Sequence, residues 1–217
     1  MNTPAPVPAP SFHPALRFAA EVVSVVLHPL FVPVYVLFFT IYESPVTMPI
    51  DPQKRFFISV SICMAYVGYP LFVVFITRKL GLIDSIRLRT SRDRIIPYVA
   101  CGIFYFWMWY VLHKEGSYPV QLSWFSLAVF LASSGGLILN NYLKVSMHAI
   151  GAGTAVGYFY LLAATTPLAM GFYLVIALLL AGLVCTARLI RNEHTPAEVY
   201  AGFFLGILAS GVAYWFS

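Results

Sequence analysis

The sequence predicts an all-α fold, a polytopic transmembrane helix bundle with six to seven spans. Hydrophobic residues make up 60% of the 217 positions and charged residues only 10%, whereas about a quarter of the residues in a soluble domain are charged. The mean hydropathy is +0.83. Apolar residues also gather in runs of roughly 20, the length that a helix needs to cross a bilayer. Lipid can solvate such apolar faces, and water cannot.

Seven apolar runs account for most of the chain after a short tail. Residues 1–14 are rich in proline and lack a basic region, so we expect a flexible, extended tail rather than a cleavable signal. Residues 15–217 are expected to form one transmembrane helical domain. The runs are Leu16–Tyr42, Phe56–Thr77, Ile95–Leu112, Val120–Leu139, Ser146–Thr165, Leu168–Ala187 and Ala197–Phe216.

The first and fifth runs differ from the others. The first is longer than a straight crossing requires and contains Pro29 and Pro33, so we expect it to tilt or to kink where proline removes backbone donors. The fifth begins with polar Ser146 and His148 and has small residues at positions 151, 153, 155 and 157. Small residues of this kind let helices approach closely in lipid.

Basic residues are distributed unevenly between the connections. If seven spans alternate strictly, the N-terminus and the loops 78–94, 140–145 and 188–196 share one side of the membrane. That side has ten Lys and Arg residues, and the other has three, Lys54, Arg55 and Lys114. The positive-inside rule makes the side with ten basic residues cytoplasmic.

Cysteine chemistry does not contribute to the predicted site. Cys63, Cys101 and Cys185 lie far apart within apolar runs, a spacing that predicts neither a zinc site nor a disulfide framework. We expect no metal, no cofactor and no nucleic-acid partner. The expected partners are the lipid bilayer and a lipid substrate.

Residues 187–202, between the sixth and seventh runs, combine charge with the start of a helix. Thr195-Pro196-Ala197-Glu198 matches a capping box, with Thr195 as N-cap. Arg188 lies six residues before His194, and Glu198 lies four after it. A helix N-terminus beside arginines favours an anion, so we expect an anion site around His194.

Two further segments lie on the same side in this topology. Ser146 and His148 begin the fifth run, and a second histidine near His194 suits a nucleophile and proton-donor pair. Arg87 and Arg94 belong to the basic segment before the third run, and the planar fork of arginine suits phosphate oxygens. A role in topology or in lipid headgroup contact would also explain these arginines.

Together the three segments resemble the signature of the type-2 phosphatidic acid phosphatase family, a family of membrane-bound lipid phosphatases. The third motif carries most of the resemblance. Arg188, His194 and Glu198 occupy its Arg, His and acid positions, and Val199 and Gly202 continue its usual ending. The resemblance covers roughly residues 87–202 and implies that the bundle has the core of this family.

The first and second motifs are degenerate. Ser146 and His148 match the second motif, in which Met147 stands where the family has glycine. Arg87 takes the Lys position of the first motif and Arg94 its Arg position.

The resemblance implies a metal-independent phosphatase that acts through a phosphohistidine. His194 would attack the phosphorus, Glu198 would orient it, and His148 would protonate the leaving lipid oxygen. The residues implied to hold the phosphate are Arg87, Arg94, Arg188 and Ser146. The implied substrate is a lipid phosphate or an isoprenyl phosphate or diphosphate, whose tail stays in the bilayer.

Departures from the signature leave other functions open. Glu198 replaces the usual aspartate and Met147 the usual glycine, which favours a degraded member that serves as a lipid-binding or structural subunit of a membrane complex. A small transporter would need polar residues near mid-membrane, where only Glu21 and His28 qualify. The expected location is the bacterial inner membrane. Bacterial phosphatases of this family generally act on the extracytoplasmic side, opposite to the positive-inside count, so the side stays open.

Overall fold

The computed structural model describes residues 12–45, 50–83, 91–166 and 170–216, with the side chains of residues 91–94 outside this description. Within these ranges the chain forms helices and connections without a strand. The helices are α1 (Pro14–Val26), α2 (Val32–Phe38), α3 (Pro52–Cys63), α4 (Tyr69–Lys79), α5 (Ser91–Glu115), α6 (Val120–Leu139), α7 (Met147–Thr165), α8 (Gly171–Ile190) and α9 (Pro196–Trp215). A π-helical turn, Phe39–Glu43, continues α2, and another, Met64–Gly68, joins α3 to α4.

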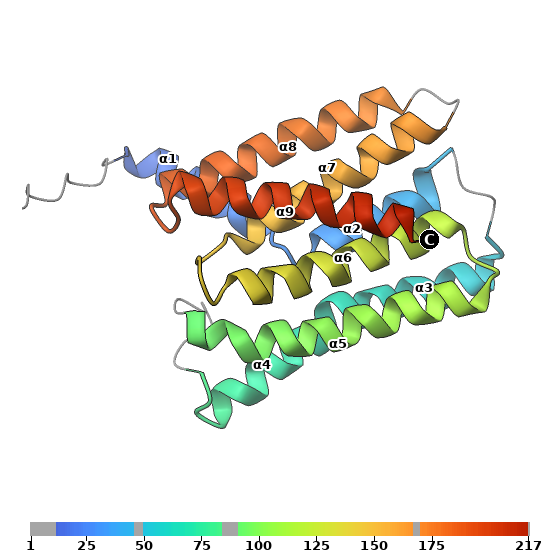
Figure 1. Ribbon diagram of the computed structural model, residues 1–217, viewed down its shortest axis with the longest axis horizontal. Coiled ribbons are helices and arrows are strands. Elements are labelled where there is room, and N and C mark those ends of the chain that lie inside the picture. The colour runs from blue at the N-terminus through green and yellow to red at the C-terminus, as the bar shows by residue number, and fades with distance from the viewer. Residues whose placement is uncertain (1–11, 46–49, 84–90, 167–169, 217) are drawn as a thin grey trace, which may run out of the picture.

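Six stretches of the described chain are long and apolar enough to cross a membrane. They are Pro52–Lys79, Ile95–Glu115, Val120–Leu139, Met147–Thr165, Gly171–Ile190 and Pro196–Trp215. In Figure 1 these helices lie side by side in one bundle. The predicted class, an all-α polytopic helix bundle, is confirmed.

The first predicted run is broken rather than kinked. α1 ends at Val26 and α2 begins at Val32, with Pro29 in the gap. Proline cannot donate to a helical ladder, so the helix cannot continue unchanged through it. The hydroxyl of Tyr35 donates to the carbonyl of Val26 at 3.0 Å and so satisfies a group that the break releases. Together the two short helices still pass from one end of the bundle towards the other (Figure 1).

The helix ends follow the alternation that the sequence predicts. Figure 1 shows α1, the α6–α7 connection and the α8–α9 turn at one end of the bundle, with the end of α4 and the start of α5. The α5–α6 connection and the C-terminal end of α9 lie at the opposite end. The predicted site segments of α7 and α9 therefore share one end.

Glycines bring α7 and α9 into backbone contact. A Cβ atom added at Gly153 would lie 2.0 Å from the carbonyl oxygen of Phe203, and one at Gly206 would lie 2.3 Å from that of Ile150. Real Cβ atoms cannot occupy such positions, so the two helices can approach this closely only with glycine. The predicted role of the small residues in the fifth run is confirmed, and this packing positions the site.

Candidate functional site

The first turn of α9 contains the predicted capping box. The Thr195 hydroxyl accepts from the Glu198 backbone N–H at 3.3 Å, and Glu198 Oε2 accepts from the Thr195 N–H at 3.1 Å. Pro196 occupies the first turn, where a missing N–H costs nothing. The reciprocal pair satisfies two donors that a helix start leaves without partners.

His194 lies immediately before this cap and is 8% exposed. Its Nδ1 is 3.0 Å from Glu198 Oε2 and 3.1 Å from the backbone carbonyl of Lys144. A carboxylate and a carbonyl only accept hydrogen bonds, so Nδ1 carries the hydrogen. A neutral imidazole in this tautomer has its lone pair on Nε2. Glu198 reaches back past the cap to make this contact, and the helix itself does not extend to His194.

The turn between α8 and α9 brings charge to the same place. α8 extends to Ile190, three residues beyond the predicted end at Ala187, so Arg188 lies in its last turn. Asn192 has a φ of 53°, a left-handed conformation that asparagine tolerates and that ends many helices. This turn folds Glu193 back towards α8.

Arg188 is buried, with 6% of its surface exposed. Its guanidinium donates to the carboxylate of Glu193 and, at 3.4 Å, to the hydroxyl of Ser24 in α1. A buried guanidinium requires such partners because its own charge is costly to remove from water. Arg188 therefore presents a fixed positive charge beside the His194 segment.

Glu193 bridges two arginines. In addition to Arg188, it accepts from Arg191 Nη2 at 2.8 Å. Partial burial acts to raise the pKa of the Glu193 carboxyl, but the hydrogen bond from Arg191 and the charges of Arg188 and Arg191 outweigh burial and lower this pKa. Glu193 is thus an ionised carboxylate held on the arginines.

His148 and Ser146 lie at the start of α7. His148 Nε2 is 2.9 Å from the backbone carbonyl of Ser24, so it donates to that oxygen. Ser146 is fully buried, and its hydroxyl caps α7 by accepting from the Ala149 N–H at 3.4 Å. The cap gives Ser146 a structural role, and its predicted contact with phosphate stays a prediction.

The helix α1 contributes residues that sequence reasoning did not assign to the site. Ser24 contacts both Arg188 and His148, and Glu21 forms an ion pair with Arg191 at 3.2 Å. The His28 ring stands edge-on to His148, with centroids 5.1 Å apart. Glu21 and His28 therefore belong to the polar end of the bundle, not to mid-membrane as in the transporter interpretation. The signal for this placement is Pro29, which ends α1 early.

The first predicted motif cannot be placed in the same way. Arg87 lies outside the described residues. The backbone of Arg94 belongs to α5, but its side chain lies outside the description. Their predicted role as phosphate ligands stays a prediction.

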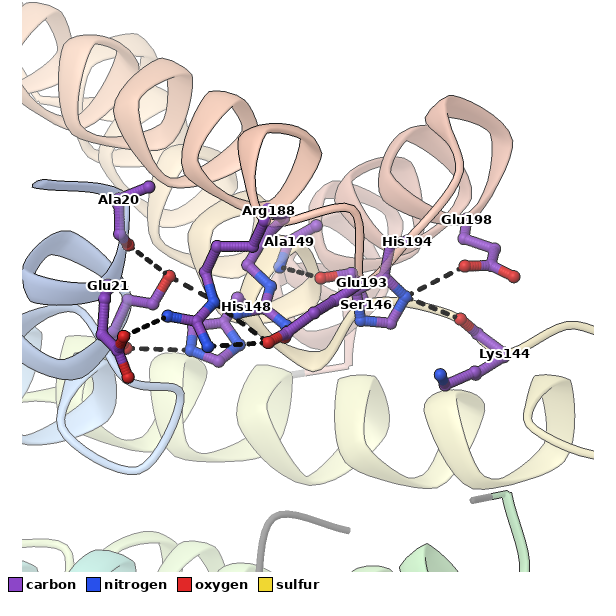
Figure 2. A network of polar contacts seen from close by, with 12 residues as sticks. Ala20, Glu21, Lys144, Ser146, His148, Ala149, Arg188, Glu193, His194 and Glu198 are labelled. Atoms are coloured by element: carbon purple, nitrogen blue, oxygen red, sulfur yellow. Dashed lines mark hydrogen bonds and ion pairs between the residues drawn. The ribbon is translucent and has the colours of Figure 1, made fainter. Parts of the chain in front are cut away.

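Figure 2 shows how these groups form a polar network at one end of the bundle. Arg188 links the two predicted histidines, because its partner Ser24 also contacts His148, and its partner Glu193 precedes His194 in the chain. Within the described ranges, no group of three or more His, Cys, Asp or Glu side chains is arranged to hold a metal ion. The arrangement offers an oriented imidazole, a second imidazole and two guanidinium groups.

Comparisons with known protein families, with curated proteins and with solved structures find no match. The functional interpretation therefore depends on the contacts of the site itself. Of the three residues in the best-matching motif, Glu198 contacts His194 directly, and Arg188 is joined to the same turn through Glu193.

Proposed function

We propose that this protein is a membrane phosphatase of the type-2 phosphatidic acid phosphatase kind, hydrolysing a lipid phosphate or an isoprenyl phosphate or diphosphate. The observation that carries the proposal is the pairing of His194 Nδ1 with Glu198 at 3.0 Å. This contact fixes the tautomer whose lone pair lies on Nε2, as a nucleophilic imidazole requires. Buried Arg188 supplies positive charge at the adjoining turn of the chain.

The proposed reaction has two steps. His194 Nε2 forms a bond to phosphorus while the bond from phosphorus to the lipid oxygen breaks, which leaves a phosphohistidine. Water then attacks this phosphorus while neutral His148 takes a proton from it, inorganic phosphate is released, and the N–P electron pair returns to His194. Arg188 neutralises the charge that develops on the phosphoryl oxygens, and Glu198 stabilises the imidazole as it becomes positive.

His148, in the imidazolium form that a nearby phosphate dianion favours, is the proposed proton donor to the leaving lipid oxygen, which leaves it neutral. In the described structure its Nε2 hydrogen is given to the Ser24 carbonyl at 2.9 Å. Proton donation therefore requires the substrate oxygen to replace this carbonyl as the acceptor. Catalytic hydrogen bonds commonly form only when the substrate is bound.

The Glu193 carboxylate forms ion pairs with the two arginines that are proposed to bind the substrate phosphate. Its carboxylate lies on the guanidinium groups of Arg188 and Arg191, where the phosphoryl oxygens of a substrate would bind. Carboxylate and phosphate suit the same planar fork. Substrate binding in this proposal displaces Glu193 and transfers both arginines to the phosphate.

The same ion pairs favour a second candidate function. If the Glu193 contacts are permanent, the chain is a catalytically degraded scaffold that binds lipid or supports a membrane complex. The two functions differ in one observable property, turnover. The proposed location for either function is the bacterial inner membrane, where the basic end of the bundle would bear the site.

The deciding experiment measures inorganic phosphate released by the purified protein in detergent, with EDTA present. The substrates are phosphatidic acid, phosphatidylglycerol phosphate and isoprenyl phosphates and diphosphates. We expect turnover of at least one, and a loss of about a thousandfold or more in His194→Ala because the nucleophile is gone. Brief incubation with a ³²P-labelled substrate should leave acid-labile label on the wild-type protein.

A matched control is available on α5. His113 belongs to the last turn of α5, whose connection to α6 lies at the opposite end of the bundle (Figure 1), and it stacks on Trp109 with ring centroids 5.5 Å apart. His113→Ala should keep its activity within about twofold of the wild type. A folded wild type that binds these lipids and releases no phosphate would favour the scaffold, and an active His194→Ala would exclude the phosphohistidine.

A further inference from the structure

We propose that an apolar groove between residues 27–39 and helices α7 and α8 binds the hydrocarbon chain of the substrate. We further propose that three aromatic side chains at its far end, Phe39, Phe159 and Tyr173, limit the length of that chain. The inference builds on the proposed function, which places the phosphate at the arginines and His194.

The groove begins one helical turn away from the polar network. It is a cavity of about 210 Å³ whose lining includes Val184 and Ala152. Val184 precedes Arg188 by four residues on α8, and Ala152 follows His148 by four on α7. Residues four apart lie on the same face of a helix. The same faces of α7 and α8 therefore carry the polar groups at one level and the groove below them.

The body of the groove is formed by apolar side chains, several of them small. Ala155 of α7 and Ala177 and Ala181 of α8 line it, and no charged residue does so. Two tyrosines also contribute to the lining, and the hydroxyl of one, Tyr35, is already bonded to the Val26 carbonyl. Such a surface binds hydrocarbon favourably and offers few hydrogen-bond partners to a polar ligand.

The far end of the groove is formed by aromatic rings. Phe39 packs against Phe159 with centroids 5.2 Å apart and against Tyr173 with centroids 4.6 Å apart. Phe159 on α7, Tyr173 on α8 and Phe39 in the segment 27–39 are the lining residues farthest along the chain from the polar network. These large side chains, in contact with one another, leave less room than the alanines that line part of the body. A hydrocarbon chain that enters from the polar end therefore stops here.

The distance from the polar network to the far end of the groove suits a lipid chain. Phe159 follows His148 by eleven residues, which at 1.5 Å per residue is about 16 Å along α7. This is close to half of the roughly 30 Å hydrocarbon core. A chain in the groove would thus reach about as deep as the tails of the adjoining leaflet.

The size of the groove excludes a helix as its occupant. One 5.4 Å turn of a helix about 10–12 Å across occupies roughly 400–600 Å³, at least about twice the volume of the cavity, which is about 210 Å³. Continuity with an anion site at one end requires an occupant with an anionic head and a narrow apolar tail. A single-chain or isoprenoid phosphate has this shape, and the second chain of a diacyl lipid would have to remain in the bulk bilayer.

Filling the groove tests the proposed chain position. Ala181→Leu adds bulk to the groove, and Gly182→Leu adds bulk to the same helix where no atom lies within 4 Å of a new Cβ. We expect Ala181→Leu to reduce kcat/KM for dodecyl phosphate about tenfold or more, with less than about twofold change for butyl phosphate. Gly182→Leu should alter neither. Equal loss for both substrates, or equal loss in both variants, would overturn the proposal.

Removing the far end of the groove tests the length limit. Phe159→Ala should shift the preferred alkyl phosphate towards longer chains, and the adjacent Tyr160→Ala should not, because Tyr160 is 60% exposed and lies outside the groove. Tyr173→Ala is the second variant if Phe159→Ala does not fold. An unchanged chain-length optimum in a folded variant of either residue would contradict the limit.

Photocrosslinking separates this inference from the proposed function. An alkyl phosphate with a diazirine at the end of its chain is bound to His194→Ala protein and irradiated. We expect label on Phe39, Phe159 or Tyr173, reduced by Ala181→Leu. Label at these rings with an inert wild type would support the groove and overturn the phosphatase. Wild-type phosphate release with label spread over the lipid-facing surface would overturn the groove and leave the phosphatase.

Discussion

Two helix interfaces of the bundle are packed by opposite means. Between α7 and α9 the backbones touch, so that a Cβ at Gly153 would lie 2.0 Å from Phe203 O. Where the π-helical turn Met64–Gly68 meets α5, aromatic rings separate the helices, and Tyr66 stacks on Tyr105 with centroids 4.8 Å apart. Backbone contact leaves no side chain that can rotate to absorb a shift, whereas large side chains can repack. The rigid interface is the one that carries the predicted site.

The rigid interface extends into the site itself. The Ser146 N–H donates to the Glu198 carbonyl at 3.2 Å, so the start of α7 is bonded to the first turn of α9. A Cβ at Gly202 would lie 2.8 Å from the Ser146 carbonyl oxygen. Misplacing a catalytic group by about 1 Å can lower the rate a hundredfold. We therefore interpret this contact as the one that positions His148 relative to His194.

Gly206→Ala is predicted to have the largest effect. The new Cβ would lie 2.3 Å from Ile150 O and 2.5 Å from Thr154 N, both backbone atoms, so α7 and α9 must separate. We expect a loss of about 3 kcal/mol in the free energy of unfolding and loss of most phosphatase activity. The measurements are thermal unfolding in detergent and kcat/KM.

Gly211→Ala is the matched control on the same helix. A Cβ at Gly211 would meet no atom within 4 Å, so stability and activity should stay near the wild-type values. If Gly206→Ala behaves like Gly211→Ala, the close contact is not what orders the site.

Glu198→Gln is predicted to have the next largest effect. Glutamine can still accept from the Thr195 N–H, so the capping box is kept, and stability should change little. The charge opposite His194 is removed, but the Lys144 carbonyl still accepts from Nδ1 and holds the tautomer. We therefore expect kcat to fall about a hundredfold, less than the loss where nothing holds the tautomer.

The measurements are kcat and the melting temperature of Glu198→Gln and of Glu198→Ala. The alanine variant should lose both, because it removes the cap as well as the charge. A glutamine variant with unchanged kcat would show that Glu198 only caps the helix.

The sequence predicted the elements whose signals are local. The capping box at Thr195 and Glu198 and most of the spans depend on residues within one turn or one apolar run of each other, and the structure contains them. The predicted end of the sixth span, Ala187, was three residues short of the end of α8 at Ile190. The helix can include Arg188 because the chain turns back and brings Glu193 to its guanidinium. In the sequence alone, a charged residue predicts the end of a span, because its ion-pair partner is not known.

The contribution of α1 could not be predicted from local signals. Ser24 meets Arg188 across 164 positions of the chain, and His148 across 124. Such contacts depend on how helices pack, which apolar periodicity does not determine. The proline in the first run predicts a kink, but the side to which α1 then turns follows from its packing on α8 (Figure 1).

Glu193→Gln is predicted to have a smaller and opposite effect on activity. Without the Glu193 carboxylate, a phosphate no longer competes with this side chain for Arg188 and Arg191, so KM for a lipid phosphate should fall a few-fold with kcat nearly unchanged. Glu21→Gln is the control, because the described ion pair of Glu21 is with Arg191, whereas Arg188 pairs with Glu193. Unchanged KM with reduced stability would make the Glu193 ion pairs purely structural.

The same variant has a predicted pH dependence. The pKa of Glu193 is lowered in the folded protein by Arg191 and Arg188, against the effect of burial. A lowered folded-state pKa stabilises the fold above the unfolded-state pKa, and this stabilisation is lost as pH falls through the folded-state value. The difference in melting temperature between wild type and Glu193→Gln should therefore be full at neutral pH and vanish well below about pH 4. A difference that grows in acid would contradict this assignment.

Tyr66→Phe is predicted to have the smallest effect and tests the adaptable interface. It keeps the ring that stacks on Tyr105 and removes one hydroxyl from the π-helical turn Met64–Gly68, none of whose residues is labelled in the network of Figure 2. Phosphatase activity should stay within about twofold of the wild type, because the α7–α9 contact is untouched. Tyr66→Ala, which removes the ring, should lower stability by about 3 kcal/mol or more while the folded fraction keeps its kcat. If its kcat instead falls as far as that of Gly206→Ala, the two interfaces act as one unit and the site depends on the whole bundle.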